Sequence, residues 1–209
     1  MDVSLPLSVL APGVRGKVLT ALARATEQLS GREVARRAGV SQRGAALVLH
    51  DLEAHGLVRA HETRSAVYYW LVREHIAADL VLALADLPAT LRSFVRERVA
   101  GWATPPLSVV LFGSTARGDG DVDSDIDLLV IRPPHINEDD DDDQWWADAS
   151  DLFIGLYQLT GNPTSMFDWT PAKLQACRPE FVENVLHDSI LLWGRPLHEL
   201  LSQAQENVA

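Results

Sequence analysis

The sequence predicts a two-domain chain of mixed α/β (α+β) class, in which a mainly helical domain precedes a domain of strands and helices. The length, the charge distribution and a change of pattern along the chain support this prediction. The 209 residues are enough for one large core or two small ones. Residues 1–75 contain ten Lys/Arg and seven Asp/Glu, a net charge of +3, whereas residues 76–209 contain eight and twenty-two, a net charge of −14. This asymmetry indicates two parts with different tasks.

The composition excludes several classes of protein. Apolar residues make up 47% and charged residues 22% of the chain, which is ordinary for a globular protein. No apolar run approaches the roughly 20 residues that a membrane span needs, and the N-terminus lacks the basic-then-apolar plan of a signal peptide. The single cysteine, Cys177, excludes an internal disulfide and a cysteine-clustered zinc site. We therefore expect a cytoplasmic protein with no membrane partner.

The first 75 residues follow a pattern of helices and then a hairpin. Ser30 stands three residues before Glu33, which is the capping-box signature of a helix start, and Ser41 caps a second, longer helix after a glycine turn. The expected elements are a helix over 17–25, a short helix ending at 38, a turn at 39–40, a helix from 41 to about 55, and strands at 57–60 and 67–71 around a polar tip.

This order resembles the winged helix-turn-helix of bacterial repressors over about residues 15–73. The segments that carry the likeness are SGREVARRAGVSQRGAALVLHDLEAHGLV and VYYWLV. A glycine turn allows the two helices to cross steeply, so that the second can enter a DNA major groove. The resemblance implies double-stranded DNA as a partner, with contacts from the start of the second helix and from nearby arginines. The implied contact residues are Ser41, Gln42, Arg43, Arg36, Arg37 and Arg64. The alternative is a domain that only dimerises or contacts another protein.

Residues 76–104 are expected to connect the two domains. Apolar residues keep helical spacing through this segment, with a break near Pro88. The pattern indicates connector helices that pack on both domains and on a second subunit, so a homodimer is expected. Thr104-Pro105-Pro106 then ends any helix, and the second domain is assigned to residues 105–209.

Two predicted strands bring a glycine and two carboxylates close together. The β-branched and aromatic run at 107–112 leads directly into Gly113-Ser114, and a second strand contains Asp125 and Asp127. Residues two apart on a strand project from one face, so these carboxylates repel one another unless a cation lies between them. Magnesium binds such pairs together with substrate phosphates. Gly113 allows the backbone to approach a phosphate, and the helix start at Ser114 offers free N–H groups to it.

The segment LFGSTARGDGDVDSDIDLLVI resembles the signature of the polymerase β-like nucleotidyltransferase superfamily, in particular its minimal bacterial branch. The likeness covers roughly residues 105–198 and implies a short mixed sheet flanked by helices. It also implies that Asp125 and Asp127 hold two Mg²⁺ ions, with a third carboxylate on a later strand. Asp168, in the segment SMFDW, is the candidate, and it would accept the proton of an acceptor hydroxyl or orient a metal ion. The residues implied to bind the phosphates of a nucleoside triphosphate, ATP being expected, are Gly113, Ser114 and Arg117.

Together the resemblances imply a DNA-binding regulator whose second domain transfers a nucleoside monophosphate to an acceptor hydroxyl while pyrophosphate leaves. An antitoxin-like protein that modifies a HEPN-type toxin is the favoured interpretation. A small-molecule (aminoglycoside-like) or tRNA-directed transferase, whose winged helix dimerises or binds substrate, stays open. So does a transcription factor with an inactive, nucleotide-sensing domain. The acidic run at 138–143 is expected to be a solvated loop that leads into a helix over about 144–160.

Overall fold

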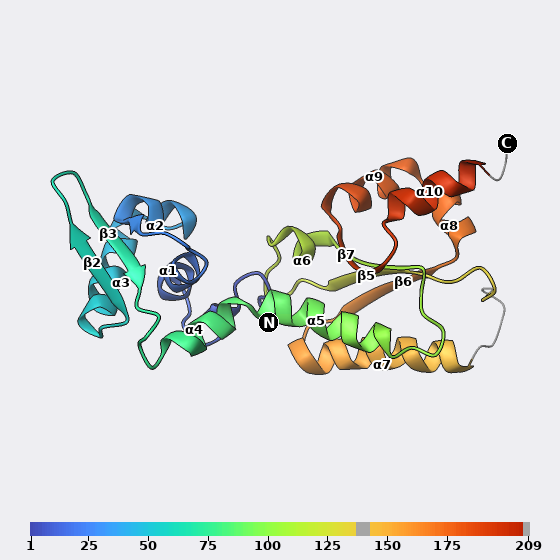
Figure 1. Cartoon of the computed structure of the whole chain (residues 1–209), viewed down its shortest axis with the longest axis horizontal. Helices are drawn as coiled ribbons and strands as arrows, with labels where there is room; N and C mark the ends of the chain where they lie inside the picture. The colour runs from blue at the N-terminus through green and yellow to red at the C-terminus, as the bar shows by residue number, and fades with distance from the viewer. Residues whose placement is uncertain (137–142, 207–209) are drawn as a thin grey trace. The chain divides into compact units, whose positions relative to one another are not determined.

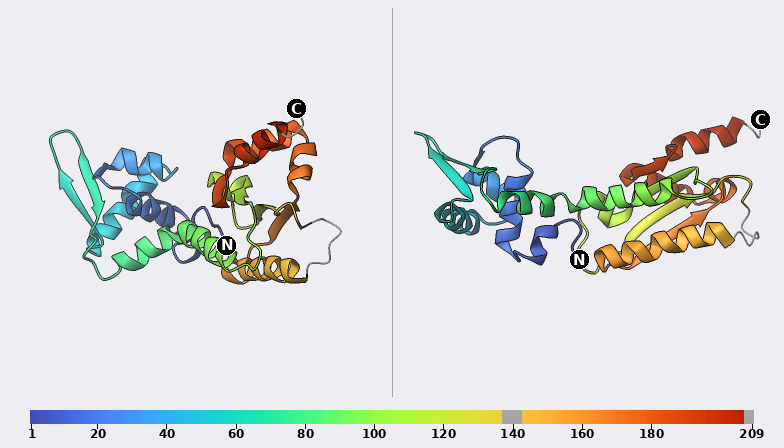
Figure 2. Two further views of the ribbon diagram at one scale, coloured as in Figure 1. Left: turned by 45° about the vertical axis from the view of Figure 1, so that its right-hand side comes forward. Right: turned by 60° about the horizontal axis from the view of Figure 1, so that its bottom comes forward.

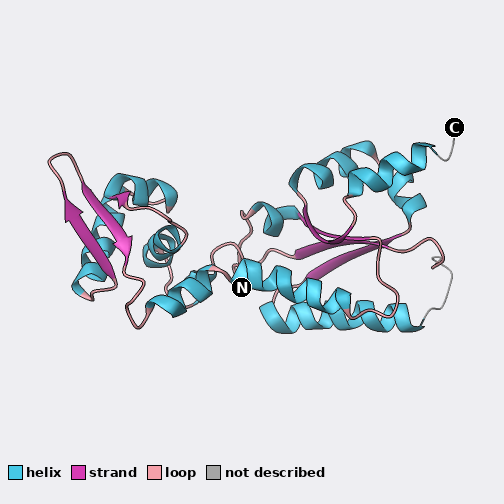
Figure 3. Cartoon of the chain, in the orientation of Figure 1, coloured by secondary structure: helices cyan, strands magenta, loops and turns pink. Residues whose placement is uncertain are grey.

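The computed structural model describes residues 1–136 and 143–206. Most of the acidic run at 138–143 therefore lies outside the described residues. Helices and two separate sheets are present, which confirms the predicted mixed α/β class (Figure 1 and Figure 3). No helix within the described ranges is long and apolar enough to span a membrane.

The chain divides into two units, each with its own core. The N-terminal unit consists of Asp2 and Ser4–Pro88. The C-terminal unit consists of Met1, Val3 and the residues from Ala89 onward. The segment at 76–104, expected to act as a connector, is shared between them. Helix α4 (Ala78–Ala85) belongs to the N-terminal unit, and α5 (Leu87–Ala100) lies almost wholly in the C-terminal unit.

The N-terminal unit contains the predicted series of helix, short helix, turn, longer helix and hairpin. Before α4 its elements are η1 (Pro6–Val9), α1 (Val14–Ala23), β1 (Leu29–Ser30), α2 (Gly31–Arg37), α3 (Gln42–Ala54), β2 (Val58–Glu62) and β3 (Val67–Leu71). The strands form an antiparallel sheet in the order β1-β3-β2, in which the two-residue β1 is an addition that the sequence pattern does not predict. The core side chains buried most completely include Val18, Leu22, Leu29, Val34, Ala45 and Leu49.

Serine caps begin both α2 and α3. The Ser30 Oγ accepts the backbone N–H of Glu33 at 3.2 Å, and the Ser41 Oγ accepts that of Gly44 at 3.1 Å. These bonds confirm the helix starts that the capping signatures predict. Gly39 adopts a φ of 61° between the two helices, and this left-handed conformation allows the chain to leave α2 and turn toward α3.

The C-terminal unit is built on a mixed sheet flanked by helices, as predicted. After α5 its elements are β4 (Ser108–Phe112), α6 (Gly113–Arg117), β5 (Ile126–Ile131), α7 (Asp143–Thr160), β6 (Thr164–Trp169), α8 (Pro171–Ala176), α9 (Pro179–Asp188), β7 (Ile190–Gly194) and α10 (Leu197–Glu206). The strand order over the described residues is β6-β5-β4-β7. Strand β4 is antiparallel to both neighbours, whereas β5 and β6 are parallel because α7 returns the chain between them.

Alternate residues of β5 face two different cores. Ile126, Leu128 and Val130 pack with side chains of α5 and α7, and Leu129 packs with side chains of α8, α9 and α10. Figure 1 and Figure 2 show these two groups of helices on opposite sides of the sheet. Asp127 lies two residues before Leu129, so its carboxylate belongs to the α8–α10 face of the sheet.

Candidate functional site

Gly113 lies where β4 passes into α6, directly against the carboxylate of Asp127. Phe112, the last residue of β4, pairs with Asp127 of β5, so the end of one strand lies beside the start of the other. Gly113 has a φ of 74°, a conformation that favours glycine. A Cβ atom at this position would overlap Oδ2 of Asp127. The structure therefore brings the predicted glycine and the predicted carboxylate into contact.

A hydrogen bond fastens the short helix α6 to the start of β5. The Thr115 Oγ1 donates to the backbone oxygen of Asp125 at 3.0 Å. At the other end of α6, Gly118 has a φ of 76°, and its N–H donates to the carbonyl of Ser114 at 3.0 Å. The backbone at Gly113 and the half-buried Ser114 is thus held beside the two carboxylates.

Asp125 and Asp127 are close enough to influence each other. Asp125 is exposed and Asp127 is half-buried. Burial raises the pKa of the Asp127 carboxyl, the negative charge of Asp125 raises this pKa further, and the positive charge of Arg117 opposes both effects. The two side chains offer oxygen atoms, the donor type that Mg²⁺ prefers, and a divalent cation would relieve their repulsion. The donor set therefore fits Mg²⁺.

Ser165 of β6 completes this cluster, and sequence reasoning missed it. Strand β6 runs parallel to β5 with Ser165 paired to Asp127, which places both side chains on the α8–α10 face. The Ser165 Oγ donates a hydrogen bond of 3.2 Å to Oδ2 of Asp125. The signal that could have found Ser165 is the parallel register of β5 and β6, which the local sequence does not reveal.

Asp168 lies elsewhere, which contradicts its assignment beside the carboxylate pair. It is three residues after Ser165, an odd number, so its side chain projects from the opposite face of β6. There its carboxylate accepts hydrogen bonds from the Arg132 Nε at 2.7 Å and from the Trp145 Nε1 at 2.9 Å. The side chains of Arg132 and Asp168 are only 4% and 9% exposed, so this is a buried ion pair of the α7 core. Within residues 1–136 and 143–206, no group of three His, Cys, Asp or Glu side chains is arranged to hold a metal ion.

Arg117 lies at the edge of the site. Its guanidinium forms ion pairs with Asp119 at 3.2 Å and with Asp188 of α9 at 3.4 Å. Asp188 also contacts the His187 Nδ1 at 2.5 Å. Arg117 therefore lies near enough to lower the pKa of Asp127, but in this structure its guanidinium binds two other carboxylates.

The residues expected to contact DNA lie on three segments of the N-terminal unit. Ser41 caps α3 with its hydroxyl, and Gln42 and Arg43 are the exposed first residues of that helix. Arg64 is exposed at the tip between β2 and β3. No ion pair engages Arg43 or Arg64 in the part of the chain that the structure describes.

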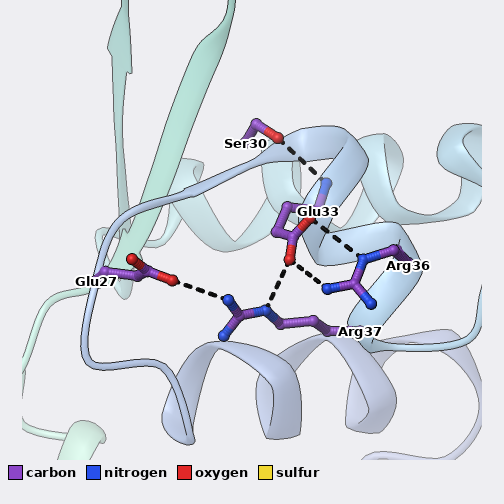
Figure 4. A network of polar contacts seen from close by, with 5 residues as sticks. All are labelled: Glu27, Ser30, Glu33, Arg36 and Arg37. Atoms are coloured by element: carbon purple, nitrogen blue, oxygen red, sulfur yellow. Dashed lines mark hydrogen bonds and ion pairs between the residues drawn. The ribbon is translucent and has the colours of Figure 1, made fainter.

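Arg36 and Arg37, in contrast, belong to an ionic network at the end of α2 (Figure 4). The Glu33 Oε1 lies 2.5 Å from the Arg36 Nη2 and 3.1 Å from the Arg37 Nε, and the Arg37 Nη2 reaches Glu27 at 2.9 Å. Hydrogen bonds from Arg36 and then Arg37 lower the pKa of Glu33 from 4.5 to about 2. Both arginines are thus already paired with carboxylates.

The match to a family model lies in the C-terminal unit. Residues 89–157 match the family model of the nucleotidyltransferase domain, which supports a nucleotidyltransferase. The matched residues include Gly113, Asp125 and Asp127 and end before β6. One solved structure, described as "Crystal structure of the toxin-antitoxin with AMP-PNP", is similar with 17% sequence identity and a TM-score of 0.37, over 55% of this chain and 87% of the other. No curated protein matches the chain.

Proposed function

We propose that the C-terminal unit is a magnesium-dependent nucleotidyltransferase domain that binds a nucleoside triphosphate, with ATP as the expected nucleotide. The observation that carries this proposal is the contact between Gly113 and the carboxylate of Asp127, with Asp125 two residues away. The match of residues 89–157 to the nucleotidyltransferase domain supports it. In this site the backbone N–H groups at Gly113 and Ser114 bind phosphate oxygens.

The carboxylate pair and Arg117 have different tasks in this reaction. Asp125 and Asp127 would hold Mg²⁺, which would supply positive charge to offset the negative charge of the triphosphate. Arg117 exchanges one of its two carboxylate partners for a phosphate oxygen. The acceptor oxygen bonds to the α-phosphorus, the bond from the α-phosphorus to its bridging oxygen breaks, the acceptor proton passes to water, and pyrophosphate leaves. Asp168 has no task here because it lies on the other face of the sheet.

For the N-terminal unit we propose a winged helix-turn-helix that binds double-stranded DNA. The order of α1, α2, α3 and the β2–β3 hairpin supports this assignment. Gln42 and Arg43 would read base edges from the start of α3, and Arg64 would contact the backbone from the hairpin tip. Arg36 and Arg37 of α2 contribute less to DNA binding than their charge indicates, because both are already paired with carboxylates. The whole chain would then be a DNA-binding regulator with a transferase domain.

A second candidate function is nucleotide sensing with little or no transfer. The observation that favours it is the composition of the site, where Ser165 rather than a third carboxylate stands beside Asp125. Such a protein would bind the nucleotide and change its DNA affinity without modifying an acceptor. A turnover assay separates the two candidates, because only a transferase releases pyrophosphate and forms a labelled acceptor in the same reaction.

Binding of a non-hydrolysable ATP analogue, measured by calorimetry with and without Mg²⁺, tests the proposed site. The double variant Asp125→Asn, Asp127→Asn should keep the fold, because it removes like-charge repulsion, and should lose magnesium-dependent binding. The matched control, Asp123→Asn with Glu183→Gln, removes two exposed acidic groups of the same unit and should bind normally. Unchanged affinity in the first double variant contradicts the proposed site.

The acceptor is identified by labelling. Full-length protein, Mg²⁺ and each labelled nucleoside triphosphate are incubated with host lysate, and the labelled fraction is separated into protein, RNA and small molecules. Label in a protein favours an antitoxin-like role, and label in tRNA or in a small molecule favours a transferase of the corresponding class. Pyrophosphate release without labelled product, or no release at all, removes the transferase proposal.

A further inference from the structure

Ser165 lies beside the carboxylate pair and contacts one of its two members. Its hydroxyl lies on the same sheet face as the pair and donates to one oxygen of Asp125 at 3.2 Å. This bond limits the rotation of the Asp125 side chain and leaves its other carboxylate oxygen available to a ligand. Ser165 is itself half-buried, so it holds Asp125 from within the sheet rather than from the solvent.

The charge of the described site matches one divalent cation. Asp125 and Asp127 contribute two negative charges between them. The other carboxylates nearby, Asp119 and Asp188, are bound to Arg117, and Asp168 is bound to a buried arginine on the opposite face. Metal pairs about 3.5–4 Å apart act as a clamp on both sides of a transferred phosphorus. A second ion in this site would have no further carboxylate of its own among the described residues.

We propose that this site takes up a single divalent cation together with the nucleotide, and that Ser165 is the positioning residue that fixes Asp125 for that ion. The inference rests on the proposed nucleotide site and adds to it the number of ions. A serine hydroxyl is neutral and donates to Asp125, whereas a carboxylate at the same position would add a negative charge and could hold a second ion.

Ion counting on the full-length protein tests this proposal. Mn²⁺ is titrated into protein held in excess over a non-hydrolysable ATP analogue, and free Mn²⁺ is followed by electron paramagnetic resonance. Wild type should bind one Mn²⁺ per bound nucleotide. Ser165→Ala should also bind one, with an affinity about three- to tenfold lower, which is the loss expected for one hydrogen bond. Ser165→Thr, which keeps the hydroxyl, should restore the wild-type affinity.

Ser165→Asp is the opposite test, because it should raise the count to two ions per nucleotide. Its matched control is Ser202→Asp on α10, where an exposed serine gains the same charge away from the site and the count should remain one. Two ions in the wild type, or an Ser165→Ala affinity equal to that of the wild type, overturn the inference and leave the nucleotide site standing. No ion and no nucleotide bound to the wild type overturn both. If Ser165→Asp does not fold, as judged by circular dichroism, the alanine and threonine variants still decide.

Discussion

The carboxylate of Asp127 lies against Gly113, and a Cβ atom at position 113 would overlap Oδ2 of Asp127. This contact links the proposed phosphate site to the proposed metal site. Gly113 allows a phosphate to approach the backbone, and it also leaves space for the carboxylate of Asp127. Glycine is required here for two separate reasons. Its φ is 74°, and its missing Cβ leaves space for Oδ2 of Asp127.

Gly113→Ala should therefore weaken nucleotide binding by tenfold or more, on the order of 1.4 kcal/mol, because the added methyl group displaces Asp127. Gly118→Ala is the matched control. Gly118 has a φ of 76°, but its Cβ would meet no atom within 4 Å. Both variants should lose about 1–2 kcal/mol of stability through backbone strain, and only Gly113→Ala should lose affinity. Equal affinities of the two variants in calorimetry would show that Asp127 is not displaced.

Asp168→Asn should destabilise the C-terminal unit without changing nucleotide affinity. The substitution removes one negatively charged partner of Arg132, and breaking a buried ion pair costs about 3–5 kcal/mol. Urea denaturation gives the stability, and calorimetry on the folded variant gives the affinity. The double variant Asp168→Leu, Arg132→Met should recover part of the lost stability, because it removes the buried charge as well. If the Asp168→Asn protein folds but no longer binds nucleotide, Asp168 is part of the nucleotide site and this prediction is wrong.

The sequence was sufficient for the part of the site that lies within one continuous segment. Gly113 and the carboxylate pair are separated only by the short helix α6 and a loop, so local patterning predicts that they meet. The register of β6 could not be predicted from the sequence, because the register of a parallel strand depends on how α7 packs. Register decides between Ser165 and Asp168, since these residues project from opposite faces of the sheet. An apolar-flanked aspartate occurs both in core ion pairs and in metal sites, and the hydrogen bonds from Arg132 and Trp145 identify Asp168 as part of a core ion pair.

The ionic network of α2 should give the N-terminal unit a stability that depends on acid pH. The pKa of Glu33 is about 2 in the folded state and about 4.5 without its arginine partners. A lowered carboxyl pKa stabilises the fold above pH 4.5, and this stabilisation is lost as the pH falls from about 4.5 toward 2. The difference in free energy of unfolding between wild type and Glu33→Gln should shrink over that interval. Urea titrations at a series of pH values measure it.

Two controls define this pH prediction further. Glu62→Gln removes an exposed glutamate of β2 that lies outside the network, and it is the matched control for the loss of one surface carboxylate. Added salt should reduce the Glu33 effect, because the network lies at the surface and its charges are screened. A Glu33→Gln difference that is independent of both pH and salt would contradict the described ion pairs.

The final prediction concerns DNA, for which the structure separates two groups of arginines. The full-length protein should bind a two-fold-symmetric operator with half-sites about one helical turn apart, and its affinity should fall steeply with salt. Arg43→Ala should weaken specific binding by about 1–3 kcal/mol, as expected if Arg43 reads a guanine. Arg36→Ala should have a smaller effect, because Arg36 is paired with Glu33. Gel-shift titrations on the upstream region compare the two variants.

The comparison of Arg43 with Arg36 also tests the alternative that this unit only dimerises. Both side chains are exposed and carry the same charge, so general attraction to DNA would make their substitutions equivalent. A base contact from the start of α3 makes them unequal, and most clearly so on the specific sequence. The net charge of −14 on residues 76–209 opposes non-specific binding and should enlarge this contrast at low salt. If no sequence-preferring complex forms at low salt, the unit serves contacts between proteins rather than contacts with DNA.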